Sequence, residues 1–169
     1  MEMSEIRPHV RNDDEYAEQV KGLSKSTGPT FFKLQARVPK RGRTETLVSA
    51  SSVMTVSLKM YAAGGENVLH RHPNEDHVFI VLSGRAVFFG PNGEMREIGR
   101  NSGVFLPRTA LYSFRAREEE PLVMLRVGAA VVPGADVNDR VGADAHEIGG
   151  FSQENKEVDV VFDGEKVFE

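Results

Sequence analysis

The sequence predicts an all-β fold, a small antiparallel β-barrel or jelly roll with a short helix or loop before it and an irregular extension after it. Short runs of β-forming residues recur along the chain, and turn residues separate them at Gly64-Gly65, Ser83-Gly84 and Gly90-Pro91. Residues 53–61 alternate apolar and polar side chains, which is the period of a half-buried strand. Many short strands between such turns favour a sandwich or a barrel.

Composition limits the classes of partner and of chemistry. The chain has 169 residues, a net charge of −4 and no cysteine. That length predicts one domain, and the charge lacks the basic footprint of nucleic-acid binding. Thiol nucleophiles and thiolate metal sites are excluded. Because no segment is apolar enough for a membrane span or a signal peptide, we expect no membrane partner and a cytoplasmic protein.

The chain divides into three parts by pattern. We expect an N-terminal extension over residues 1–30 and a barrel over residues 31–132, with residues 31–38 as a first strand. Residues 133–169 are rich in Gly, Ala and Asp at their start and predict an extension that packs on the barrel or on a partner. Within it, residues 158–162 favour a final strand or a segment outside the barrel.

Three of the five histidines lie close together at His70, His72 and His77. Residues two apart on a strand point to the same face, so His70 and His72 can reach one point. If His77 opens the next strand on that face, three ring nitrogens can cap one metal ion. Three protein ligands that leave positions open are the arrangement used for catalysis.

The spacing around these histidines resembles the first motif of the cupin family. That motif runs Gly, five residues, His-x-His, three or four residues, Glu, six residues, Gly, and here Gly64, His70, His72 and Gly84 fit it. Counting back from Gly84 puts His77 at the glutamate position. With the shorter gap, Asp76 would supply a carboxylate instead. The count to Gly84 favours His77, and Glu75 and Asp76 would then be loop residues that could orient a histidine.

The second cupin motif would fall on residues 101–112, and here the resemblance is weaker. Pro107 matches, whereas Asn101, Thr109 and Tyr112 stand where Gly, Gly and His are usual. The resemblance covers about residues 53–132. It implies a small antiparallel barrel that holds a divalent metal and often pairs, so we expect a homodimer.

The departures from the family pattern bear on the metal. With histidine at the glutamate position, three neutral imidazoles would hold one divalent transition metal, and imidazole suits Fe, Ni, Zn and Cu. A three-histidine Fe(II) site is known among cupin dioxygenases, so the resemblance favours Fe.

Tyr112 stands at the family's fourth ligand position and is the candidate catalytic residue. Its phenol could donate a hydrogen bond to an oxygen at the metal, or ligate the metal as a phenolate. Its usual pKa near 10 makes donation the less costly role. Alternatively, Tyr112 is an ordinary barrel tyrosine.

The surroundings of the metal are expected to be apolar, with Met60, Phe79, Phe88, Phe105 and Phe114 as wall residues. Such a wall suits a hydrophobic or aromatic small molecule. Arg126 interrupts an apolar run over residues 122–127. It is either exposed on the barrel surface, which we favour, or turned inward to clamp an anionic group.

Two classes of function remain open. The first is a metal-dependent enzyme that acts on a small organic molecule, most specifically with dioxygenase-like Fe(II) chemistry, or as a lyase or isomerase that uses the metal as a Lewis acid. The second is a module that binds a small ligand or a metal without turnover. Fold alone does not separate them, because cupin barrels host many functions.

Overall fold

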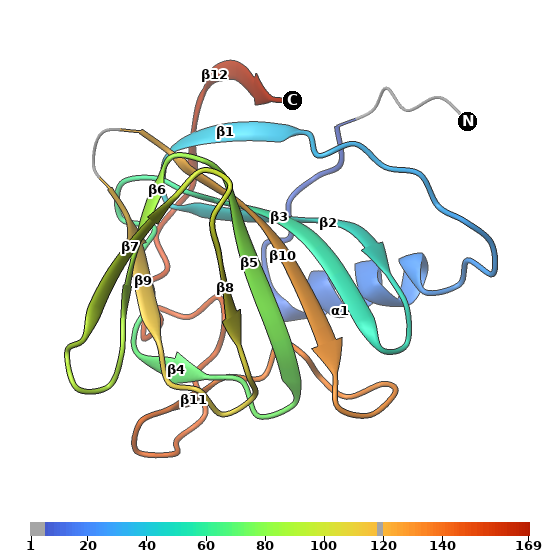
Figure 1. The fold of residues 1–169 in the computed structure, drawn as a ribbon. Helices are drawn as coiled ribbons and strands as arrows, with labels where there is room; N and C mark the ends of the chain where they lie inside the picture. Colours follow the sequence, from blue (N-terminus) through green and yellow to red (C-terminus); the bar gives the residue numbers. More distant parts are fainter. Residues whose placement is uncertain (1–5, 118–119) are drawn as a thin grey trace.

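The computed structural model describes residues 6–117 and 120–169. Over these residues the chain is mostly strand with one helix, which confirms the predicted all-β class (Figure 1). The elements are α1 (Asp13–Leu23), β1 (Ala36–Arg41), β2 (Arg43–Ala50), β3 (Met54–Tyr61), β4 (His70–Arg71), β5 (Glu75–Ser83), β6 (Arg85–Phe89), β7 (Met95–Gly99), β8 (Gly103–Leu106), β9 (Ser113–Ala116), β10 (Leu122–Ala130), β11 (Val141–Gly142) and β12 (Val161–Phe168).

Two antiparallel sheets form the body of the molecule. One has the order β2-β3-β10-β5-β8 and the other the order β7-β6-β9. Phe79 of β5, Phe88 of β6 and Phe114 of β9 meet in one buried cluster, so the inner faces of the two sheets share a core. Among the described residues, ladder hydrogen bonds do not join the two sheets into one closed barrel.

A second layer covers part of the outer face of the larger sheet. β12 pairs with β1, and Ala36 and Val38 of β1 pack on Leu58 and Met60 of β3 (Figure 1). The expectation that β3 is half-buried therefore holds only at its start, where Met54 is 46% exposed. From Ser57 to Tyr61 both faces are buried, because Leu58 and Met60 lie under β1 while Ser57 and Lys59 face the space between the sheets.

The expected first strand begins later than the sequence pattern indicates. Phe31 and Phe32 are exposed and lie outside any strand, and β1 starts at Ala36. The reason is tertiary, since Ala36 pairs with Phe168 at the far end of the chain. The C-terminal extension thus supplies the partner of β1, with its strand at 161–168 rather than at 158–162.

Helix α1 has clear start signals and packs beside β2. The Asn12 side chain accepts a hydrogen bond from the backbone N–H of Glu15, and acidic residues in the first turn face the positive end of the helix. Tyr16 is buried against Leu47 of β2. Within residues 6–117 and 120–169, no helix is long and apolar enough to cross a membrane.

The turn between β5 and β6 generates the first prediction. Gly84 has φ +76°, and a Cβ there would lie 2.7 Å from the Pro121 carbonyl oxygen. Gly93 has a similar φ of +79° but open space around it. Gly93→Ala should lower the free energy of unfolding by about 1–2 kcal/mol through backbone strain alone. Gly84→Ala should lower it clearly more in chemical denaturation, and an equal loss in the two variants would contradict this packing.

Candidate metal centre

The side chains of the candidate site come from the start of β5 and the segment just before it. Along β5 the residues that point inward alternate, so Glu75, His77 and Phe79 all face the space between the sheets. His70 lies on β4, and His72 follows that strand directly. All three histidines are buried, and Glu75 is 0% exposed.

His72, Glu75 and His77 form a group whose ligand atoms lie within 4.8 Å of one another. The Nδ1 atoms of His72 and His77 are 3.4 Å and 3.5 Å from Oε1 of Glu75. Both Nδ1 atoms and Oε2 of Glu75 are buried without a hydrogen-bond partner among the described residues. Because unpartnered buried polar atoms are costly and these are metal-ligand types, the group fits a divalent cation.

This group shares two members with the predicted set of His70, His72 and His77. Glu75, expected in a loop, is the first residue of β5, and its place in the alternation with His77 and Phe79 was the available signal. His70 lies next to the group, with its ring centroid 5.1 Å from that of His72. The three-histidine set stays a prediction, and the structure adds Glu75 as a donor.

Asp76, the alternative carboxylate, points away from the group. Its side chain accepts a 2.7 Å hydrogen bond from the backbone N–H of Arg108. Neighbours on a strand face opposite sides, so Asp76 cannot share the orientation of Glu75 and His77.

The expectation that Arg126 lies on the surface is wrong. Arg126 is buried on β10 and forms an ion pair with Glu75 on β5. Gly128, two residues on, faces the same way, and a Cβ there would overlap the Glu75 carboxylate. The bare backbone of Gly128 therefore makes the room in which the pair sits.

Tyr112 lies at the centre of the site. Its backbone N–H and C=O pair with those of His70, and its hydroxyl is 3.0 Å from Nε2 of His77. Burial raises the pKa of the Tyr112 phenol above its usual value near 10, so it stays protonated and can donate. The Tyr112 hydroxyl thus occupies Nε2 of His77, and Nδ1, which lies 3.5 Å from Oε1 of Glu75, stays available to a metal.

The imidazoles are held neutral. Burial lowers the pKa of both His70 and His77 to about 3, and lowers the pKa of His72 well below its usual value. Positive neighbours act in the same direction, Arg140 at His70 and His72 and Lys59 at His77. Neutral imidazole is the form that binds a metal, so no proton has to leave at neutral pH.

The wall of the site is not the apolar surface that was expected. Met60 faces the outer layer and Phe105 is 64% exposed, whereas Phe79, Phe88 and Phe114 do lie in the interior cluster. A cavity of about 20 Å³ beside the histidines has aromatic and cationic residues around it. Its lining comprises Arg43, Lys59, Tyr61, Asn67, His70, His72, Phe79, Tyr112, Phe114, Arg126, Arg140 and Asn155.

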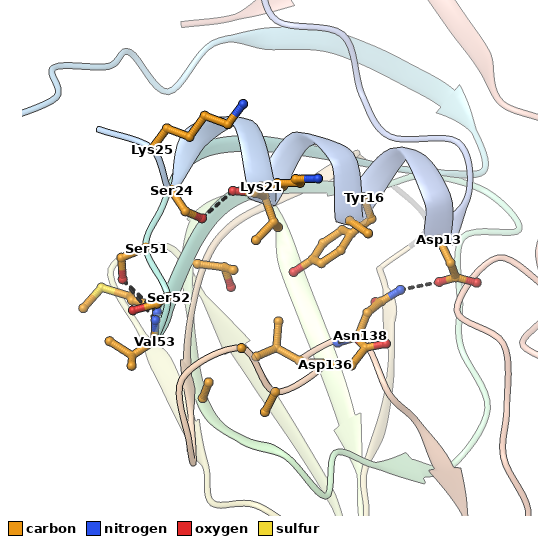
Figure 2. Close-up of a pocket in the computed structure, with 18 residues that line it drawn as sticks. Asp13, Tyr16, Lys21, Ser24, Lys25, Ser51, Ser52, Val53, Asp136 and Asn138 are labelled. Atoms are coloured by element: carbon orange, nitrogen blue, oxygen red, sulfur yellow. Dashed lines mark hydrogen bonds between the residues drawn. The ribbon is translucent and has the colours of Figure 1, made fainter. Parts of the chain in front are cut away.

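A larger pocket of about 530 Å³ lies between α1, the turn after β2 and the loop at 134–138 (Figure 2). Its surface is mainly apolar, and no histidine lines it. At one end the Asn138 side chain donates a hydrogen bond to Asp13, which ties the loop to the start of the helix.

The neutral histidines predict a pH dependence of stability. Between about pH 6.5 and 3 each takes up a proton in the unfolded chain but not in the folded one, so stability falls as the pH falls. In metal-free protein, each depressed imidazole should contribute about 1.4 kcal/mol per pH unit to this slope. Denaturation at several pH values should show a shallower slope for His70→Asn. His146→Asn should change the slope less, because carboxylate neighbours raise the pKa of this exposed imidazole and it is protonated in both the folded and the unfolded chain over most of this range. Equal slopes in wild type and His70→Asn would contradict the burial effect.

Similarity to known proteins follows the fold. A family model of the cupin domain matches residues 57–128. No curated protein is similar enough in sequence to count as a relative. An uncharacterized conserved protein with a double-stranded β-helix domain from Klebsiella pneumoniae superposes with a TM-score of 0.56 at 20% identity, over 65% of this chain and 89% of that one.

Two further solved structures align less well. KdgF from Halomonas sp. has a TM-score of 0.47 at 18% identity, over 52% of this chain and 79% of that one. The DMSP lyase DddQ from Ruegeria pomeroyi has a TM-score of 0.46 at 23% identity, over 57% of this chain and 46% of that one. The Klebsiella protein shares the fold of this chain. Residues 57–128 are thus similar to a cupin domain, and the chain has the fold of the cupin superfamily.

Proposed function

We propose that this chain is a metal-dependent enzyme that acts on a small organic molecule, with Fe(II) as the favoured ion. The observation that carries the proposal is the convergence of buried donor atoms without partners on His72, Glu75 and His77. Two histidines and one carboxylate with open positions are the ligand set of non-haem Fe(II) oxygenases. Such an ion supplies open positions at which a substrate and O₂ are brought together and activated.

The protein's own groups would orient and tune this centre. The Arg126 guanidinium holds Glu75 in place from β10, and Oε1 of Glu75, the oxygen in that ion pair, is also the one that lies 3.4 Å and 3.5 Å from the Nδ1 atoms of His72 and His77. The Tyr112 phenol, next to His77, keeps its proton and can donate it in a hydrogen bond to a reacting oxygen. The rings of Phe79 and Phe114 pack beside the site in the buried cluster.

A ligand-binding module without turnover is the second candidate. The observation in its favour is the size of the cavity, since about 20 Å³ holds little more than one water-sized group. Steady turnover of any substrate would exclude this alternative. Chemistry without O₂, as in a lyase or an isomerase, would use the same ligands and is separated from oxygenation by oxygen consumption.

The metal content of variants tests the ligand set. Protein purified without added metal should carry about one divalent ion per chain by mass spectrometry, and His72→Ala and His77→Ala should lose it. Glu75→Gln should lose it if the carboxylate ligates, whereas His70→Ala should lose it if the three-histidine set is correct. Asp76→Asn is the matched control and should keep the metal, because its carboxylate faces Arg108.

Several outcomes would contradict the proposal. A wild-type chain that takes up no divalent ion on titration would exclude a metal centre. Loss of the ion in Asp76→Asn together with retention in His77→Ala would show that the assigned register of β5 is wrong.

Replacing Tyr112 tests its catalytic role. Tyr112→Phe should keep the metal and the fold, and should lower kcat by about 10²–10³ with a smaller effect on KM, since a well-aimed donor acts on charge that develops in the transition state. Tyr16→Phe removes a buried hydroxyl outside the site and should leave kcat unchanged. Loss of metal in Tyr112→Phe would identify a ligand, and unchanged activity would reduce Tyr112 to packing.

A further inference from the structure

The C-terminal extension completes the cavity beside the histidines. β11 pairs with β4, which places Gly142 opposite His70 at the end of the sheets where the site lies (Figure 1). Asn155 closes the same end, because its side chain accepts the backbone N–H of Val68 and donates to Gly150. Arg140, just before β11, lines the cavity from this extension.

Four cations line the cavity, and three of them have a carboxylate partner. These pairs are Arg43 with Glu157, Lys59 with Glu45 and Arg126 with Glu75. Arg140 has no such partner among residues 6–117 and 120–169. Its guanidinium lies against Gly150, where a Cβ would overlap it, and makes one 3.3 Å hydrogen bond to the Asn138 carbonyl.

The local charge balance therefore favours an anion. A guanidinium that is partly removed from water loses hydration, and a counter-charge compensates that loss. A divalent ion on His72, Glu75 and His77 would add to the positive charge. The Oδ1 atom of Asn67 already accepts the N–H of Phe114, and Asn155 is bonded through both its oxygen and its nitrogen, so Arg140 is the cation left without a counter-charge among the described residues.

The backbone around Arg140 is held in place before any ligand arrives. Asn138 is bonded to Asp13 on α1 (Figure 2), and the Asp139 carboxylate accepts a 2.8 Å hydrogen bond from the Asn74 side chain. Anchors on both sides limit the freedom that Arg140 would lose on binding, which is how a protein pre-organises a recognition group.

We propose that Arg140 binds the carboxylate group of a small organic acid and thereby selects the substrate of the metal centre. The selection of a substrate rests on the proposed function, because it needs a metal centre that turns the substrate over. The binding of a carboxylate by Arg140 does not depend on the metal. Arginine's planar fork matches a carboxylate with two parallel hydrogen bonds. The cavity of about 20 Å³ holds little more than one water-sized group, so only a small acid fits this assignment, and the side chains of the C-terminal extension have to move aside to admit its body.

Calorimetric titration of the purified full chain with acetate tests the assignment, and acetamide serves as the neutral probe of the same shape. Wild-type protein should bind acetate and not acetamide. Arg140→Gln should weaken acetate binding about tenfold or more. Arg71→Gln is the matched control on the adjoining strand β4 and should bind acetate as the wild type does, because Arg71 does not line the cavity.

Three results would overturn the proposal: unchanged acetate affinity in Arg140→Gln, equal binding of acetamide, or binding of inorganic phosphate in preference to acetate. If circular dichroism shows that Arg140→Gln does not fold, the Arg140→Lys variant is titrated instead. It keeps the charge without the fork, so weaker acetate binding is expected and wild-type affinity would overturn the assignment.

Performing each titration on chelator-treated and on metal-loaded protein separates this proposal from the proposed function. Arg140-dependent acetate binding in a chain that never takes up metal would support the carboxylate site and refute the metal enzyme. One metal per chain, with acetate binding that does not depend on Arg140, would support the metal centre and refute the carboxylate site.

Discussion

The buried ion pair between Glu75 and Arg126 is the interaction on which the centre of this molecule depends. It joins β5 to β10, the two neighbouring strands in the middle of the larger sheet, and it lies directly beside His72 and His77. Removing one partner of such a pair leaves an uncompensated buried charge and costs about 3–5 kcal/mol. The same contact therefore supports the fold and positions the carboxylate of the candidate metal centre.

The interior is divided between packing and chemistry. Tyr61, Phe79, Phe88, Phe114 and the other members of their cluster fill one part of the space between the sheets. The rest holds charges arranged in pairs, such as Lys59 with Glu45 across the β2–β3 ladder. Replacing a buried ion pair by apolar residues of similar volume is often neutral or stabilising, so these pairs are not explained by stability alone.

The site also draws on parts of the chain outside the matched cupin domain. Residues 57–128 supply the histidines, Glu75, Tyr112 and Arg126, whereas Arg140 and Asn155 come from the extension that follows. Glu45 and Arg43, which precede the domain, complete the charge pairs. The domain would thus provide the metal chemistry, and the flanking segments would decide which ligand meets it.

The sequence by itself determined the class of fold and the histidine cluster, because both depend on local pattern. Alternation along strands, turn residues such as Gly84, and the spacing of His70, His72 and His77 are visible without tertiary contacts. The start of β1 was not visible in the sequence, because its partner strand β12 lies at the other end of the chain.

Only the tertiary structure decided which polar residues join the histidines. Glu75 and Arg126 are 51 positions apart, and their pairing depends on the register between β5 and β10. A charge in an apolar run is compatible with either face of a strand until its neighbours are known. Arg140 shows the same limit, because nothing in its local sequence indicates that a loop after the last barrel strand returns to cover the site.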